Sequence, residues 1–106
     1  MEKRQLLKGN TETIILGSLQ HGPKHGYRIS QWVQEESREY FRFTPGMLYP
    51  LLHKMEKEKL IAAEWQEGEG TVKKKIYRIT EKGQKALVQN RAILLEFSSR
   101  IQKLIS

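Results

Sequence analysis

The side chains in this sequence that could do chemistry are basic or aromatic, and their spacing turns them toward one surface. Residues 43–61, FTPGMLYPLLHKMEKEKLI, have the period of a helix with an apolar stripe along one side. The groups opposite or beside that stripe are Tyr49, His53, Lys54 and Lys57. Such groups neutralise phosphates and donate hydrogen bonds to them, so the pattern indicates a polyanionic partner.

The charge of the whole chain agrees with such a partner. Its 106 residues contain 19 Lys and Arg against 12 Asp and Glu, a net charge of +7. A basic excess of this kind is typical of proteins that bind nucleic acid, an anionic membrane surface or an acidic protein. The length suits one domain with one modest core.

Other features of the composition exclude several classes. The chain has no cysteine, so disulfides and thiolate metal sites are excluded. It has neither the apolar run of a signal peptide nor one long enough to span a membrane, which predicts a soluble, cytoplasmic protein. His21 and His25 are four residues apart, but Gly22-Pro23 breaks any helix between them. Since no phosphate loop or nucleophile elbow is present either, we expect no metal, no cofactor and no catalytic residue.

Three predicted helices position the basic residues. The first begins at Asn10 or Thr11 and ends before Gly22-Pro23, and the second spans about residues 25–37. The third is capped by Thr44, followed by a proline whose missing N–H costs nothing at the first helical position. A turn with aromatic plugs joins the second helix to the third: Tyr40, Phe41 and Phe43.

After residue 59 the apolar period changes from 3.6 to 2. Residues 60–66 and 74–80 each fit a short strand, and the glycines between them predict a hairpin tip. A long helix then begins at Thr80. Its apolar positions recur every three or four residues, as in the seam of a coiled coil: Leu87, Asn90, Leu94, Phe97, Ile101 and Leu104.

This order of elements predicts an α+β fold that is mostly helical. Residues 1–80 form a winged helix-turn-helix of three helices and a two-stranded wing, and residues 81–106 form a C-terminal dimerisation helix. In this architecture the third helix enters the major groove of double-stranded DNA, with the wing beside it. The residues expected to contact DNA are Tyr27, Thr44, Gly46, Tyr49, His53, Lys54, Lys57, Lys73, Lys74 and Lys75.

Several of these assignments have a structural alternative. Tyr49 could be a plug between helices, Tyr27 could pack in the core, and the wing lysines could belong to a solvated hairpin. The apolar seam of the last helix could pack on its own domain instead of on a second chain. Trp32 and Trp65 are expected in the core or at an interface. A different class of function is a winged-helix protein-interaction module with only non-specific DNA affinity. Membrane docking is disfavoured, because the basic residues do not share one amphipathic face.

Three segments resemble the PadR family of bacterial transcriptional regulators: LLKGNTETIILGSLQHGPKHGYRI, TPGMLYPLLHKMEKEKLI and KKKIYRITEKGQKAL. The resemblance covers residues 6–97. It implies a winged helix whose C-terminal helix pairs two subunits, a homodimer that represses from palindromic operators and is often released by a small molecule. Since the sequence ends after one such helix, it is similar to the short subfamily.

The resemblance also bears on an effector pocket. Some short members of the family bind flat aromatic drugs between the two C-terminal helices, using a tryptophan. Leu94 stands at the matching position in this sequence, and Phe97 is the nearby aromatic residue. An effector pocket of that kind would contain Leu94 and Phe97 and would lack the tryptophan.

Overall fold

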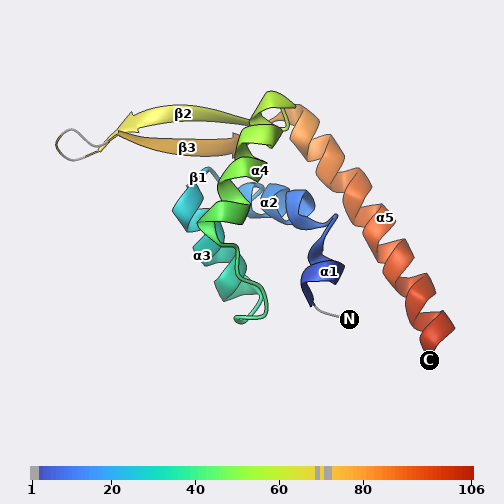
Figure 1. Cartoon of the computed structure of the whole chain (residues 1–106). Coiled ribbons are helices and arrows are strands. Elements are labelled where there is room, and N and C mark those ends of the chain that lie inside the picture. Colours follow the sequence, from blue (N-terminus) through green and yellow to red (C-terminus); the bar gives the residue numbers. More distant parts are fainter. Residues whose placement is uncertain (1–2, 69, 71–72) are drawn as a thin grey trace.

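The computed structural model describes residues 3–68, 70 and 73–106 (Figure 1). In this part of the chain the elements follow in the order α1 (Lys3–Leu7), α2 (Thr11–Leu19), β1 (Lys24–His25), α3 (Gly26–Glu36), α4 (Pro45–Lys57), β2 (Ile61–Glu67), β3 (Lys73–Ile79) and α5 (Glu81–Ile105). This is the predicted α+β order of three helices, a two-stranded wing and a long helix, with α1 and β1 added.

One apolar core lies between α2, α3, α4 and the base of the hairpin. Its fully buried side chains come from each of these elements: Ile15, Leu16, Leu19, Ile29, Leu48, Leu52, Met55 and Ile61. Burying a side chain of this size contributes roughly 1.5–3 kcal/mol. Ser18 is buried among them, and its hydroxyl donates to the carbonyl of Ile15 at 2.6 Å, so it carries no unpaired polar group. The core therefore fixes α4 with its apolar stripe inward.

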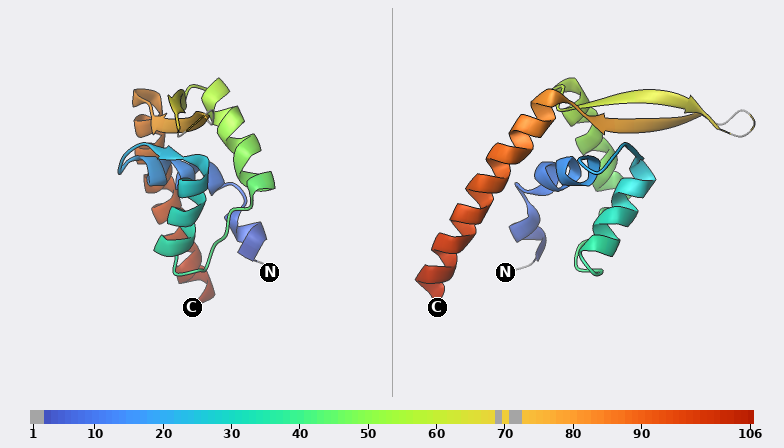
Figure 2. Two further views of the ribbon diagram at one scale, coloured as in Figure 1. Left: turned by 90° about the vertical axis from the view of Figure 1, so that its left-hand side faces the viewer. Right: turned by 180° about the vertical axis from the view of Figure 1, so that it is seen from behind.

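The three strands form an antiparallel sheet in the order β1-β3-β2. β2 and β3 pair along their whole length, from Ile61 opposite Ile79 to Glu67 opposite Lys73. The base of this hairpin and the start of α5 meet at the end of α4, and the hairpin and the helix then diverge (Figures 1 and 2). The structure thus has the winged-helix form, with the wing projecting beyond the helices.

The start of α5 is fastened to the end of α4. The backbone N–H of Thr80 donates to the carbonyl of Leu60 at 3.1 Å, and the Thr80 hydroxyl accepts from the N–H of Gly83 at 3.0 Å as the cap of α5. Gly83 lies against the Leu60 carbonyl and Ile79, with no room for a Cβ. Lys82 donates to the Glu58 carbonyl at 2.7 Å. These contacts make the α4–α5 junction a rigid joint.

α5 packs on α2 in its first half only. Leu87 is buried in the core, and the Asn90 side-chain amide donates to the Thr13 hydroxyl at 3.1 Å. The helix then runs on past the rest of the chain (Figure 2), and nearly every residue from Arg91 onward is exposed. Within the described residues, no helix combines the length and apolar character that crossing a membrane would require.

The helical period of residues 43–61 puts Lys59 on the apolar side of α4, and this expectation is wrong, because α4 ends at Lys57 and Lys59 turns outward with a φ of 63°. Of the two alternatives for Trp65, the core is wrong, because β2 has by then passed the helices and the side chain is 66% exposed. Its place at an interface stays a prediction. Of the aromatic plugs, Phe43 is buried and Tyr40 is 55% exposed.

Candidate nucleic-acid interface

The N-terminus of α4 is open to solvent. The carbonyl of Thr44 accepts from the N–H groups of Met47 and Leu48 at 3.1 and 2.9 Å, and within the described chain its side chain makes no capping hydrogen bond. Gly46 is exposed, with open space on the side where a Cβ would stand. The first turn of a helix is a favourable place for an anion, because its N–H groups lack partners within the helix.

The outer face of α4 carries the expected polar groups. His53 and Lys57 are exposed, and Tyr49 is 46% exposed. Lys54 is exposed as well, but its ammonium lies 3.0 Å from a carboxylate oxygen of Glu12 on α2. That hydrogen bond raises the pKa of Lys54 above its ordinary value. Lys54 therefore helps to join α4 to α2, whereas His53 and Lys57 point freely outward.

Tyr49 has one side against the protein and the other in solvent. A Cβ built on Gly26 would lie 2.8 Å from Cε1 of Tyr49 and 2.9 Å from its hydroxyl oxygen. The ring thus packs across the first residue of α3. Tyr49 fills a gap between α3 and α4, as one reading of the sequence held, and still offers an exposed surface.

A hollow of about 340 Å³ joins the start of α3 to α4 and β3. Its lining consists of aromatic and basic side chains with one glycine: His25, Gly26, Tyr27, Arg28, Tyr49, Lys74, Lys75 and Tyr77. Tyr27 is 69% exposed, so the alternative that it packs in the core is wrong. Arg28, whose guanidinium is 3.1 Å from Glu35, was not singled out from the sequence, although it directly follows Tyr27.

The three wing lysines are not equivalent. Lys73 and Lys74 are exposed on β3, whereas the Lys75 ammonium lies 2.8 Å from Oε1 of Glu56 on α4. This hydrogen bond raises the pKa of Lys75 above its ordinary value. Next to it, burial raises the pKa of Tyr77. Two lysines of the wing are thus open to a partner and the third is held by the protein itself.

The expected dimer seam is divided along α5. Leu87 is only 6% exposed, so it belongs to the core of its own chain and has little surface left for a partner. The amide of Asn90 is likewise occupied by Thr13. The later seam residues are free of the core, with exposed fractions of 38% for Leu94, 63% for Phe97, 40% for Ile101 and 81% for Leu104.

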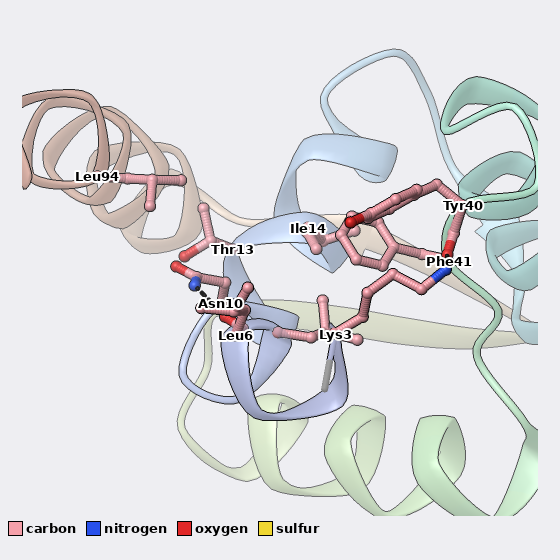
Figure 3. Close-up of a pocket in the computed structure, with 9 residues that line it drawn as sticks. Lys3, Leu6, Asn10, Thr13, Ile14, Tyr40, Phe41 and Leu94 are labelled. Atoms are coloured by element: carbon pink, nitrogen blue, oxygen red, sulfur yellow. Dashed lines mark hydrogen bonds between the residues drawn. The ribbon is translucent and has the colours of Figure 1, made fainter. Parts of the chain in front are cut away.

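Two hollows lie beside Leu94, between α1, α2 and α5. The more apolar one, of about 330 Å³, is shown in Figure 3, where Leu94 points from α5 toward the side chains of the other elements. It is lined by Lys3, Leu6, Leu7, Asn10, Thr13, Ile14, Tyr40, Phe41 and Leu94. The second, of about 450 Å³, also reaches Phe97. Both depend on α1, a helix that the sequence reasoning missed.

No metal site is apparent in the part of the chain that the structure covers. Among those residues, no group of three or more His, Asp or Glu side chains is arranged to hold an ion. His21 instead lies beside Trp32, with 6.1 Å between the ring centres. The imidazole Nδ1 of His25 is 3.2 Å from the carbonyl oxygen of Lys75.

Comparison with known proteins gives consistent results. A family model described as the transcriptional regulator PadR-like family matches residues 15–89. The transcriptional regulator Rv3488 of Mycobacterium tuberculosis is 32% identical over 88 residues, which cover 83% of this chain and 81% of that protein.

Solved structures are similar over most of the chain. A transcriptional regulator from Clostridium thermocellum has a TM-score of 0.88 at 28% identity, covering 96% of this chain and 99% of that one. Bacillus subtilis PadR, solved in complex with operator DNA, has a TM-score of 0.72 at 27% identity. That match covers 77% of this chain and 45% of the longer PadR chain.

Proposed function

The chain belongs to the PadR-like family of DNA-binding transcriptional regulators, and we propose that it is a homodimeric repressor of an inverted-repeat operator. The observation that carries this proposal is the exposed face of α4, where Tyr49, His53 and Lys57 are turned away from the core beside the open lysines of the wing. A basic helix next to a basic hairpin fits the major groove and the adjoining backbone of double-stranded DNA.

Each part of this surface has a distinct role in the proposal. Thr44 and the N–H of Gly46 bind a phosphate at the start of α4. His53 and Lys57 enter the major groove, with Tyr49 at its edge and Lys54 reaching DNA only by leaving Glu12. Tyr27 donates its hydroxyl to the backbone of the same strand. Lys73 and Lys74 neutralise phosphates beside the groove, each adding about 0.9 to the salt dependence of binding.

The partner for α5 in this proposal is the α5 of a second copy. Leu94, Phe97, Ile101 and Leu104 leave a long apolar surface in water, and covering such a surface stabilises an assembly by roughly 25 cal/mol per Å². Residues 1–80 then serve as the DNA-binding domain and residues 81–106 as the dimerisation helix. Two α4 helices in one dimer would read half-sites about one helical turn of DNA apart.

Regulation would act through the same helix. An effector that binds near Leu94 and Phe97 would change the pairing of the two α5 helices, and the rigid α4–α5 joint would carry that change to α4. Such a repressor works in the cytoplasm, where its operator is. The hollows beside Leu94 are large enough for a small effector.

Titration by fluorescence anisotropy tests the proposal. The protein is added to DNA from upstream of its own gene and to a scrambled duplex of equal length, at two salt concentrations. We expect a preference of about 10³-fold for the native fragment. Equal affinities that both fall steeply with salt would reject sequence-specific repression at this site and favour the interaction module with non-specific DNA affinity.

A further inference from the structure

We infer that Lys75 and Glu56 form a latch that sets the angle of the wing against α4, which makes Lys75 a positioning residue for DNA binding and not a phosphate contact. The inference rests on the proposed DNA-binding function and concerns how its surface is held in shape. It revises the expectation that all three wing lysines act alike.

The first support is the burial of the pair. The side chains of Lys75 and Glu56 are 29% and 35% exposed, with 2.8 Å between Nζ and Oε1. In the pairs Arg28–Glu35 and Lys54–Glu12, by contrast, one side chain is more than half exposed. A partly buried charged hydrogen bond is stronger than one in water, and separating its partners is correspondingly more costly.

The second support is the number of elements that meet at Lys75. Its backbone is paired with Trp65 of β2, and its carbonyl lies 3.2 Å from Nδ1 of His25 in β1. Its ammonium is 5.8 Å from the ring centre of Trp65 and 5.5 Å from that of Tyr77. Lys75 thus links the middle of the wing to α4 by its charge and to β1 and β2 by its main chain.

The third support is that the wing lysines differ in whether their charge is free to neutralise a phosphate. A lysine adds to the salt dependence of DNA binding when it replaces counterions on a phosphate. The charge of Lys75 is already balanced by Glu56, whereas Lys73 and Lys74 are exposed. Lys73 and Lys74 can therefore meet phosphates while Lys75 stays with Glu56.

A double-mutant cycle separates positioning from phosphate contact. Operator affinity is measured against salt concentration for Lys75→Met, Glu56→Gln and the double variant, with Lys74→Met as the matched control. For a latch, either single change weakens binding by about tenfold with an unchanged salt slope, and the double variant is no worse than the singles. Lys74→Met instead reduces the slope by about 0.9.

The opposite pattern would overturn the latch. If Lys75 contacts a phosphate, Lys75→Met reduces the slope by about 0.9. Glu56→Gln then removes a repulsive charge and leaves binding unchanged or tighter, and the two effects add.

A measurement without DNA tests the Lys75–Glu56 latch independently of the proposed function. In a Trp32→Phe background, Trp65 is the remaining tryptophan and reports on the nearby ammonium. Glu56→Gln should shift its emission as Lys75→Met does, and should have no effect once Lys75 is replaced. An unchanged emission in Glu56→Gln would reject the latch. Absence of operator preference in the wild-type protein, with the emission result intact, would reject the proposed function alone.

Discussion

The ring of Tyr49 on α4 lies against the Cα of Gly26 on α3, so closely that a methyl group at Gly26 would come within 2.8 Å of Cε1. The other side of the same ring is exposed on the face of α4 that we assign to DNA. The direction in which Tyr49 points is therefore set by a residue that has no side chain.

Gly26→Ala should change DNA binding more than stability. The added methyl meets the far end of a flexible side chain, so the Tyr49 ring swings outward and α3 stays in place. We expect operator affinity to fall by about fivefold, equivalent to about 1 kcal/mol, with little change in the urea midpoint. The same substitution made in a Tyr49→Ala protein should have no further effect on affinity. A large loss of stability would show that Gly26 is needed for the fold itself.

Gly83→Ala should destabilise the protein, because there the neighbours are backbone. A Cβ would meet the Leu60 carbonyl and would lie 2.8 Å from Cγ1 of Ile79. Overpacking of this kind costs about 1–3 kcal/mol. Gly17→Ala is the matched control, since its Cβ would have open space within α2 and a helical alanine gains roughly 0.5–1 kcal/mol over glycine. Chemical denaturation of both variants should give shifts of opposite sign, and equal shifts would contradict the tight α4–α5 joint.

Charged substitutions on the second half of α5 should separate the proposed dimer. Leu94→Glu combined with Ile101→Glu places two carboxylates on the apolar seam, and we expect a folded monomer in analytical ultracentrifugation that no longer binds its operator. Gln89→Glu is the control, because residue 89 lies on a different side of the helix at 100° per residue. Retention of the dimer by the double variant would place the interface elsewhere.

The wing should lose stability at alkaline pH. Burial raises the pKa of Tyr77 above its ordinary value of 10.0, so the unfolded chain loses this proton first and unfolding becomes more favourable as pH rises from about 10. Lys75, held by Glu56, acts in the same direction above its ordinary value of 10.5. Burial lowers the pKa of Lys24, which acts in the opposite direction.

Comparing Tyr77→Phe with the wild type isolates the contribution of the phenol. Melting temperatures measured between pH 8 and pH 11.5 should fall less steeply above pH 10 in Tyr77→Phe, since no phenol is left to ionise. Parallel curves would mean that Tyr77 ionises equally well in the folded protein.

The sequence was sufficient for the elements that are long and periodic. α4 and α5 were predicted because a stripe repeating over 13 and 25 residues leaves little choice of structure. α1 and β1 were missed because five and two residues are too few to show a period. β1 is a strand only because it pairs with β3, a contact between distant parts of the chain.

The site was predictable as a surface but not in its internal contacts. Periodicity identified the outer face of α4, yet it could not show that Lys54 pairs with Glu12, 42 residues away. It likewise assigned Leu87 and Asn90 to the dimer seam, where a second chain would cover them. The structure shows that the cover is the same chain. The three lysines at 73–75 look alike in sequence. Only the fold brings Glu56 of α4 to Lys75 and so distinguishes it from the other two.

α5 is held at its start and extends away from the rest of the chain, so it acts as a lever arm. α5 has 25 residues, which at 1.5 Å each gives an arm of about 37 Å. Because the joint is rigid, a change of about 5° in the angle at which two such arms pair in the proposed dimer would move the other end of each arm by about 3 Å. In the proposed dimer, substitutions near Leu104 would therefore change the distance between the two α4 helices. A repressor of the proposed kind could acquire a new operator spacing while every residue on the outer face of α4 and the wing stays the same.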